Sequence, residues 1–194
     1  MLLQEKFKNH QIVLASQSPR RKQLLEGIGI QFISRPLDID EQFPEKLKRE
    51  QIAIYLAKAK AEEAKKNISE NEIIITADTI VWLNNSVLNK PADKMEARKM
   101  LHQLSGKMHE VVTAVSITST KKSTHFYSIT EVHFKRLNED EIEYYIEHYK
   151  PFDKAGAYGV QEWIGYIAVE KINGSFYNVM GLPTKELAEE LLAF

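Results

Sequence analysis

The 194-residue sequence contains no cysteine. Disulfides, cysteine nucleophiles, thiolate zinc sites and cysteine-ligated iron–sulfur clusters are therefore excluded. Long apolar runs are absent too: runs such as residues 73–75 and 80–83 are far shorter than the roughly 18 residues of a membrane-spanning helix. The N-terminus lacks the apolar core and small-residue cleavage site of a signal peptide. These absences predict a cytoplasmic protein without a membrane partner.

The sequence also lacks an excess of either charge. Lys and Arg number 26 against 27 Asp and Glu, a formal charge of −1, so we expect no nucleic-acid partner. Hydrophobic residues make up 43% and charged residues 27%, which is typical of a globular protein with a buried core. The length predicts a single domain over residues 1–194. Whether the chain forms a homodimer is left open by these features.

Several common catalytic motifs are missing. The sequence has no G-x-x-x-x-G-K-[ST] phosphate loop, no dinucleotide-binding fingerprint, no H-E-x-x-H zinc motif and no G-x-S-x-G elbow. The six histidines are scattered along the chain and suggest no common site. The chemistry must therefore rest on charged and hydroxyl side chains.

Hydrophobic spacing and turn residues predict a chain in which strands and helices alternate. Helices are predicted to start at Ser18-Pro19 and Asn138, to cover about residues 47–66 and 97–104, and to close the chain from about residue 184. Strands are predicted at residues 12–15, 32–34, 72–77, 80–83, 87–88, 111–117, 126–134 and 164–171. This order favours an α/β or α+β fold with a mixed sheet.

The segment after the first predicted strand combines hydroxyls, guanidiniums and a helix start. Ser16, Ser18, Arg20 and Arg21 lie there, followed by the free N–H groups at the beginning of the helix. Such a helix end attracts phosphate, and guanidiniums bind phosphate oxygens with two hydrogen bonds. The residues alone fit equally well with a capped helix that carries two solvated arginines.

Acids and lysines form a second candidate set. Asp78 directly follows an apolar predicted strand, where a carboxylate is costly unless it meets a metal, a partner or a crevice. Glu41, in an acidic loop that also contains Asp38, could supply a second carboxylate for Mg²⁺. Lys60 lies among other helix lysines and Lys90 in a loop, so either one alone could be a plain surface residue. Together, two acids and several cations fit metal-assisted phosphoryl transfer.

These segments resemble the Maf family of nucleoside triphosphate pyrophosphatases over almost the whole chain. The matching segments are residues 14–21 (LASQSPRR), 40–41, 56–61 (LAKAKA), 77–79 (ADT), 90–91, 104–106, 109–113, 153–161 (DKAGAYGVQ) and 178–183. The resemblance implies a two-lobed fold with a central cleft, related to the enzymes that clear inosine triphosphate. It further implies hydrolysis of a nucleoside triphosphate to the monophosphate and pyrophosphate with a divalent cation, Mg²⁺ or Mn²⁺.

The resemblance also assigns roles to residues. Asp78 matches the family's proposed catalytic base, while Glu41, Lys60 and Lys90 match its other cleft charges. Glu41 and Asp78 are the expected metal ligands. Residues expected to bind substrate are Ser16, Ser18, Arg20, Arg21, Thr79 and Gln161.

Three positions indicate the branch of the family. Arg20, Thr79 and Gln161 match the branch similar to dTTP/UTP pyrophosphatases. The Gln161 amide offers one donor and one acceptor, complementary to N3–H and O4 of thymine or uracil. Glu162 and Trp163 follow it, where many members have Gly. Two alternatives stay open: a pyrophosphatase for purine or modified nucleotides such as 7-methyl-GTP, and a non-enzymatic nucleotide-binding regulator of septum formation.

Overall fold

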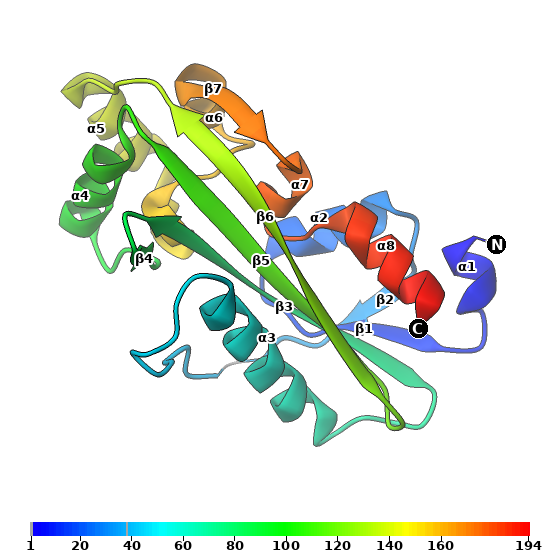
Figure 1. The fold of residues 1–194 in the computed structure, drawn as a ribbon. Coiled ribbons are helices and arrows are strands. Elements are labelled where there is room, and N and C mark those ends of the chain that lie inside the picture. The colour runs from blue at the N-terminus through cyan, green and yellow to red at the C-terminus, as the bar shows by residue number, and fades with distance from the viewer. Residues whose placement is uncertain (1, 38) are drawn as a thin grey trace. The chain divides into compact units, whose positions relative to one another are not determined.

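The computed structural model describes residues 2–37 and 39–194, and these residues form a mixed sheet with helices between its strands (Figure 1). Within this part of the chain the sheet has seven strands in the order β2-β1-β3-β5-β6-β7, with β4 paired to β3. β1 pairs in parallel with β2 and β3, whereas the pairs β3–β4 and β6–β7 are antiparallel. The predicted α/β class with a mixed sheet is confirmed.

The elements have the following bounds. The strands are β1 (Gln11–Leu14), β2 (Phe32–Ser34), β3 (Glu72–Leu83), β4 (Ser86–Leu88), β5 (Met108–Thr118), β6 (Ser123–Phe134) and β7 (Val169–Asn173). The helices are α1 (Leu3–Lys6), α2 (Pro19–Gly27), α3 (Glu50–Lys65), α4 (Lys94–Leu104), α5 (Glu139–Tyr149), α6 (Trp163–Ala168), α7 (Phe176–Met180) and α8 (Thr184–Ala193). Two short 3-10 helices, η1 (Pro151–Asp153) and η2 (Ala155–Ala157), follow α5.

The chain divides into two compact units. Unit 1 consists of Met1–Asp78, Thr113–Ser128 and Gly181–Phe194, and unit 2 of Thr79–Val112 and Ile129–Met180. The boundary passes through β3, β5 and β6, each of which contributes residues to both units. In unit 2, α4 packs against α5 and η2.

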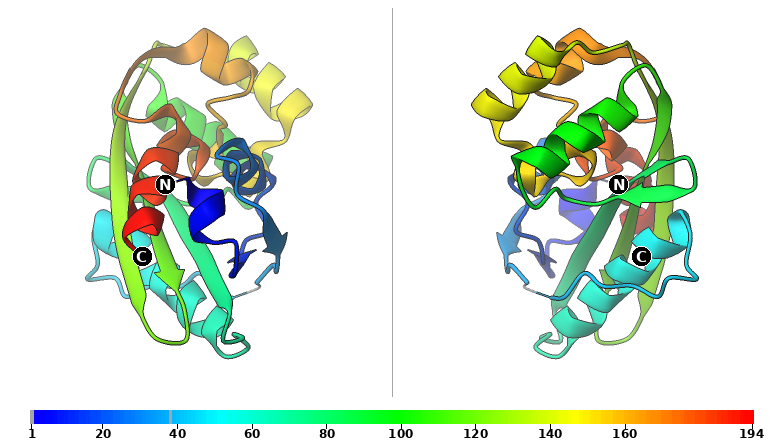
Figure 2. Two further views of the ribbon diagram at one scale, coloured as in Figure 1. Left: turned by 90° about the vertical axis from the view of Figure 1, so that its right-hand side faces the viewer. Right: turned by 90° about the vertical axis from the view of Figure 1, so that its left-hand side faces the viewer.

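The topology of unit 1 places α2 and α3 on opposite faces of the sheet. α2 connects β1 to β2, α3 connects β2 to β3, and β1 lies between the other two strands. The two connections therefore cross the sheet in opposite directions, and right-handed crossovers then require opposite faces. Figures 1 and 2 show α3 covering one face of this unit, with α1 and α8 over the other. A loop of residues 15–18 connects the carboxyl end of β1 to α2.

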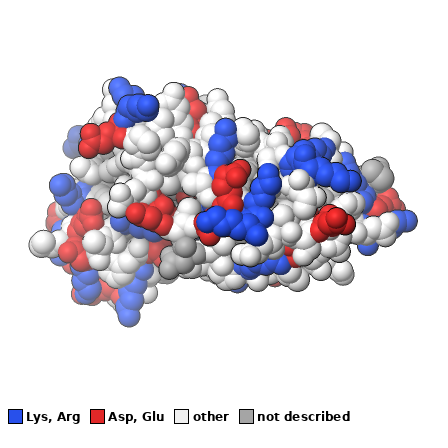
Figure 3. Space-filling view, turned by 90° about the horizontal axis from the view of Figure 1, so that it is seen from below, with Lys and Arg blue, Asp and Glu red and all other residues white. Residues whose placement is uncertain are grey.

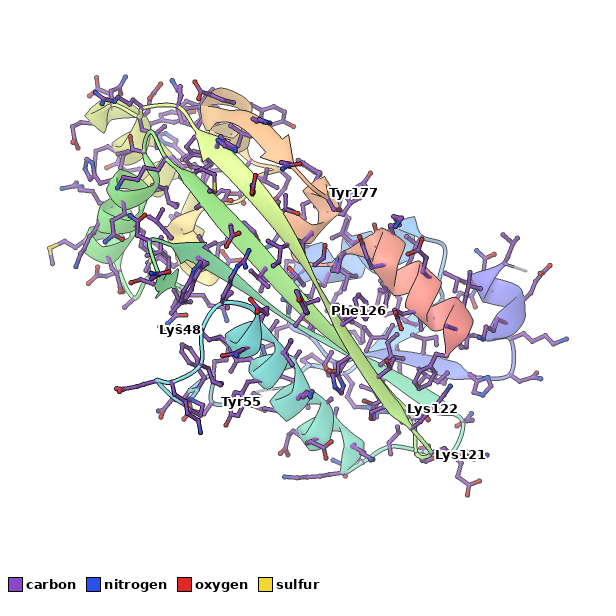
Figure 4. All side chains as sticks on the ribbon, in the orientation of Figure 1. Lys48, Tyr55, Lys121, Lys122, Phe126 and Tyr177 are labelled. Carbon is purple, nitrogen blue, oxygen red and sulfur yellow. The ribbon has the colours of Figure 1, made fainter. Side chains whose placement is uncertain are left out.

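α3 begins later than predicted. It starts at Glu50 rather than at residue 47, because Arg49 adopts a positive φ of 49° that a right-handed helix cannot contain. Its buried side chains are Ile52, Ala53, Leu56, Ala57, Ala61 and Ala64. Tyr55 is 42% exposed and projects from the outer side of the helix (Figure 4).

The two strands predicted at residues 72–77 and 80–83 are one continuous strand, β3. Residues 72–78 are buried without interruption, and pairing continues from β1 at one end of β3 to β4 at the other. Asn84 and Asn85 have φ of 49° and 61°, so they form the two-residue turn of the β3–β4 hairpin. Asp78 therefore lies inside a strand and not at its end.

The strand predicted at residues 164–171 is wrong for residues 164–168 and confirmed for residues 169–171. Residues 163–168 form α6, and β7 begins only at Val169. Ile164 and Ala168, four residues apart, are both buried, whereas Tyr166 between them is 83% exposed. This is helical and not strand periodicity. The short helices α1 and α7 were not predicted either.

In unit 2, His109 is buried against Tyr158 and Phe134. Its Nε2 lies 2.7 Å from the Tyr158 hydroxyl oxygen, and the three rings meet edge to face. Burial lowers the pKa of His109 to about 3, with a smaller contribution from His133. The unfolded chain binds a proton near pH 6.5 whereas the folded chain does not, so the stability is full above pH 6.5 and falls as the pH drops toward 3.

We expect this histidine to reduce the free energy of unfolding by about 2 kcal/mol between pH 7 and pH 5, since each pH unit below 6.5 contributes about 1.4 kcal/mol. Urea unfolding at the two pH values measures the change. His109→Gln should remove most of it, and His10→Gln, at an exposed position, should not. An equal pH dependence in both variants would contradict the assignment.

The surface matches the balanced composition. Acidic and basic side chains lie side by side on the face shown in Figure 3 instead of gathering by sign. Among residues 2–37 and 39–194, no helix has both the length and the apolar character needed to cross a membrane.

Candidate active site

The loop after β1 is organised by its two serines. The Ser16 hydroxyl accepts a hydrogen bond from the Ser18 N–H at 3.2 Å, and Ser18 caps α2 by accepting from the Arg21 N–H at 3.4 Å. Pro19 occupies the first turn of α2, as predicted. Each hydroxyl keeps its own hydrogen to donate to a ligand. The serines therefore shape the loop and can still contact a phosphate at the positive end of α2.

Arg21 is held over this loop from two sides. Its Nε donates to the Gly181 carbonyl at 2.8 Å and its Nη1 to the Ser16 hydroxyl at 3.4 Å. Burial lowers the pKa of Arg21, the carboxylates of Asp78 and Glu41 oppose that effect, and neighbouring Arg20 adds to it. Two guanidiniums and two carboxylates thus act on one another within unit 1.

One buried hydrogen bond aligns α3 with β3. The Thr76 hydroxyl donates to the Ala57 carbonyl at 2.9 Å. Asp78 lies two residues beyond Thr76 and so points to the same side of the strand, while Lys60 lies one turn beyond Ala57. This register places Lys60 and not Lys58 beside Asp78, and Lys58 is exposed.

Lys60 bridges the two predicted acids. Its Nζ donates to Asp78 Oδ1 at 2.6 Å and to Glu41 Oε1 at 2.8 Å. The Lys60 and Asp78 side chains are 13% and 8% exposed, whereas that of Glu41 is 38% exposed. The bridge brings carboxylates that are 37 positions apart in the sequence onto one ammonium group.

Asp78 is the most deeply placed acid of this group. Burial raises its pKa, and the charges of Lys60 and Arg21 oppose the rise. A carboxylate with a raised pKa is a stronger base than a solvated one. Asp78 is therefore suited to accept a proton, as long as the cations keep it ionised.

Glu41 reaches Lys60 from the loop between β2 and α3. Asp40 beside it accepts a hydrogen bond from the Gln42 N–H at 3.2 Å and so stabilises a local turn. Asp38, also part of the predicted acidic loop, lies outside the described residues.

Glu41 and Asp78 offer carboxylate oxygens, the donors that a hard divalent cation prefers. Among residues 2–37 and 39–194 no group of three or more His, Asp or Glu is arranged to hold a metal ion. Mg²⁺ does not need such a cage when it is bound through one or two carboxylates together with substrate phosphates and water. The carboxylates of Glu41 and Asp78, which Lys60 holds close to one another, fit that mode of binding.

Three further predicted residues lie in unit 2. Thr79 directly follows Asp78 in β3, so its side chain points to the other face of the strand and is partly buried. Lys90 is exposed in the loop after β4, next to Asn89, whose carbonyl accepts the Gly156 N–H at 3.2 Å. Gln161 is partly buried, and its Oε1 is buried without a hydrogen-bond partner among the described residues.

The structure thus brings together part of the predicted site. Unit 1 gathers six predicted residues: Ser16, Ser18, Arg21, Glu41, Lys60 and Asp78. Arg20 belongs to the same unit and lies close enough for its positive charge to contribute to the lowered pKa of Arg21. Thr79, Lys90 and Gln161 belong to unit 2.

A polar network in unit 2 was not predicted. Tyr145 donates to Glu162 Oε2 and accepts the Gly159 N–H at 3.0 Å, while Lys154 Nζ lies 3.1 Å from Glu162 Oε1. The sequence carried one signal for it: Glu162 stands where the resemblance leads one to expect Gly. Tyr145, on the apolar stripe of its helix, looks like an ordinary core residue in the sequence.

The chain is similar over almost its whole length to a protein family and to named relatives. A family model described as "Maf-like protein" matches residues 11–194. A protein of Parabacteroides distasonis named dTTP/UTP pyrophosphatase is 51% identical over 191 residues, which cover 98% of this chain and 99% of that one. A Bacteroides fragilis protein of the same name is 49% identical over 183 residues, covering 94% and 95%.

Among solved structures, one described as a nucleoside-triphosphatase, a dITP/XTP pyrophosphatase of Mycobacterium abscessus, matches with a TM-score of 0.45 and 16% identity. The match covers 94% of this chain and 96% of that one.

Proposed function

The chain belongs to the Maf family, and from this premise we propose that it hydrolyses dTTP and UTP to the nucleoside monophosphate and pyrophosphate. The observation that carries the chemistry is the Lys60 bridge between Asp78 and Glu41. The names of the relatives at about 50% identity support the choice of substrate.

Asp78 serves as the general base in this proposal. It takes a proton from a water molecule whose oxygen attacks the α-phosphorus, and the bond between that phosphorus and the bridging α–β oxygen breaks. Pyrophosphate leaves with the electron pair of the broken bond, and the proton on Asp78 passes to solvent. Lys60 keeps Asp78 ionised and fixes the direction of its carboxylate.

The β1–α2 loop holds the triphosphate. The N-terminus of α2 and the hydroxyls of Ser16 and Ser18 donate to phosphate oxygens, and Arg20 and Arg21 supply the positive charge. We assign Lys90 a similar role, in which its ammonium group balances negative charge of the triphosphate. Charge that develops on the leaving pyrophosphate is stabilised by such preorganised donors.

A divalent cation, Mg²⁺ or Mn²⁺, completes the proposal. Glu41 and Asp78 would hold it together with phosphate oxygens of the substrate. When bound, the cation supplies neutralisation of phosphate charge.

Gln161 reads the base. A buried carbonyl oxygen without a partner, such as Gln161 Oε1, is unfavourable in the free protein. A ligand that donates a hydrogen bond to it removes this cost and so gains affinity. The N3–H of thymine or uracil would donate to Oε1, and O4 would accept from the amide nitrogen. We propose that Thr79 and Arg20 help to form the pocket around this base.

Isotope labelling tests the reaction. With Mg²⁺, dTTP or UTP in ¹⁸O-water should yield labelled nucleoside monophosphate and unlabelled pyrophosphate, with no nucleoside diphosphate released. Label in pyrophosphate or inorganic phosphate alone would contradict attack at the α-phosphorus. A panel with dGTP, ATP and 7-methyl-GTP in the same assay measures base preference, expected to favour dTTP and UTP by at least about 10-fold in kcat/KM.

A further inference from the structure

We propose that Tyr145 and Glu162 are positioning residues that set the base selectivity of the Gln161 amide. The inference rests on the proposed function, since it concerns how the base-reading side chain is held. It extends the site to a helix, α5, that none of the predicted site residues belongs to.

The Tyr145 hydroxyl links α5 to the segment from Gly159 to Glu162. The Tyr145 O–H donates to Glu162 Oε2, and the Tyr145 hydroxyl oxygen accepts the Gly159 N–H at 3.0 Å. Tyr145 is fully buried, so its position is fixed by packing. Burial, together with the bond to Glu162, raises the pKa of Tyr145 and keeps the hydroxyl protonated as a donor.

Glu162 is held by charge as well. Lys154 Nζ lies 3.1 Å from Glu162 Oε1 and 2.7 Å from Asp153 Oδ1, and the Lys154 side chain is only 8% exposed. An ammonium group buried to this degree requires a carboxylate partner. Both oxygens of Glu162 therefore have a partner, one in Tyr145 and one in Lys154, and the carboxylate has one defined orientation.

Gly159 connects this carboxylate to the base-reading amide. A β-carbon added at residue 159 would lie 2.8 Å from the Glu162 carboxyl carbon and 3.0 Å from Gln161 Nε2. The ends of both side chains thus pack over the same glycine. Because Glu162 is fixed by Tyr145 and Lys154, it limits where the Gln161 amide can lie, and Gln161 Oε1 stays buried without a partner.

The network therefore gives its residues two different roles. Gln161 contacts the base, while Tyr145 and Glu162 act through it and touch neither the phosphates nor the reacting water. Loosening the network should therefore weaken discrimination between bases and leave the phosphate chemistry working. A role in folding alone would instead lower activity on all nucleotides equally.

Two substitutions weaken the network. Tyr145→Phe removes both hydrogen bonds of the hydroxyl, to Glu162 and from Gly159. Glu162→Gln keeps the shape of the side chain but removes the charge that faces Lys154. Their matched controls are Tyr144→Phe, a half-exposed neighbour on the same helix, and Glu170→Gln on the exposed side of β7. A third variant, Gly159→Ala, retains every charge and every backbone hydrogen bond and displaces only the two side-chain ends.

The measurement is kcat/KM for dTTP and for dGTP on each purified full-length variant, with the melting temperature as a check of folding. We expect the dTTP/dGTP ratio to fall at least about fivefold in Tyr145→Phe, Glu162→Gln and Gly159→Ala, mainly through a higher KM for dTTP. The controls should keep the wild-type ratio.

Gly159→Ala keeps the test decisive if Tyr145→Phe fails to fold. Selectivity that stays at the wild-type value in folded variants, or equal losses on dTTP and dGTP, would overturn the inference while the proposed function stands. If the wild-type protein released pyrophosphate from none of the nucleotides in the panel, the proposed function would be overturned and the inference with it.

Discussion

Asp78→Asn is expected to lower kcat for dTTP by at least about 100-fold, the lower end of what a general base contributes. The amide has nearly the same shape as the carboxylate but cannot accept a proton from water. Lys60 keeps its second partner, Glu41, at 2.8 Å, so the substitution leaves no isolated ammonium group. The protein should therefore remain folded and still bind nucleotide.

Steady-state kinetics, together with nucleotide binding measured by calorimetry, check this result. Asp140→Asn is the matched control, since Asp140 is exposed in the first turn of α5 and should keep wild-type turnover. A purified, folded Asp78→Asn protein with wild-type kcat would show that Asp78 is not the base.

Lys60→Met is expected to lower turnover by roughly 10- to 100-fold at neutral pH, because it leaves Asp78 buried without its closest cation. Burial already raises the pKa of Asp78, and Lys60 is the strongest opposing charge. Without it the pKa rises further, and a larger fraction of the carboxyl is protonated and cannot act as a base. Activity should accordingly recover in part as the pH is raised above neutrality.

This pH dependence separates the two substitutions. Asp78→Asn has no proton to lose at residue 78 and should show no such recovery. Lys58→Met, at an exposed position about half a helical turn before Lys60, should change kcat by less than about twofold. Equal losses in the Lys58 and Lys60 variants would contradict the register that the Thr76–Ala57 hydrogen bond establishes.

Local signals in the sequence were sufficient to predict where the capped helices α2 and α5 begin. Ser18 and Pro19 predict the start of α2, and Asn138 with Glu141 predicts the capping box of α5; both are present in the structure. These features depend on hydrogen bonds between residues three apart, so a single sequence contains all the information needed.

Predictions failed where a distant partner changes the local preference. Asp78 reads as a strand end because an unpaired carboxylate should not be buried, yet Lys60 from α3 supplies its partner and β3 continues to Leu83. Residues 164–171 read as a strand from their apolar content, whereas packing of Ile164 and Ala168 on one side selects a helix for the first part.

The sequence by itself determined which features are candidates for the proposed site: two acids, two arginines, a capped helix start and the motifs that resemble the Maf family. It could not tell Lys60 from Lys58 without that resemblance, because the two differ only in the face of α3 on which they lie. The tertiary structure decided this through the alignment of α3 on β3. It likewise joined Tyr145 of α5 to Glu162, since a hydrogen bond between residues far apart in the chain exists only after the elements have packed.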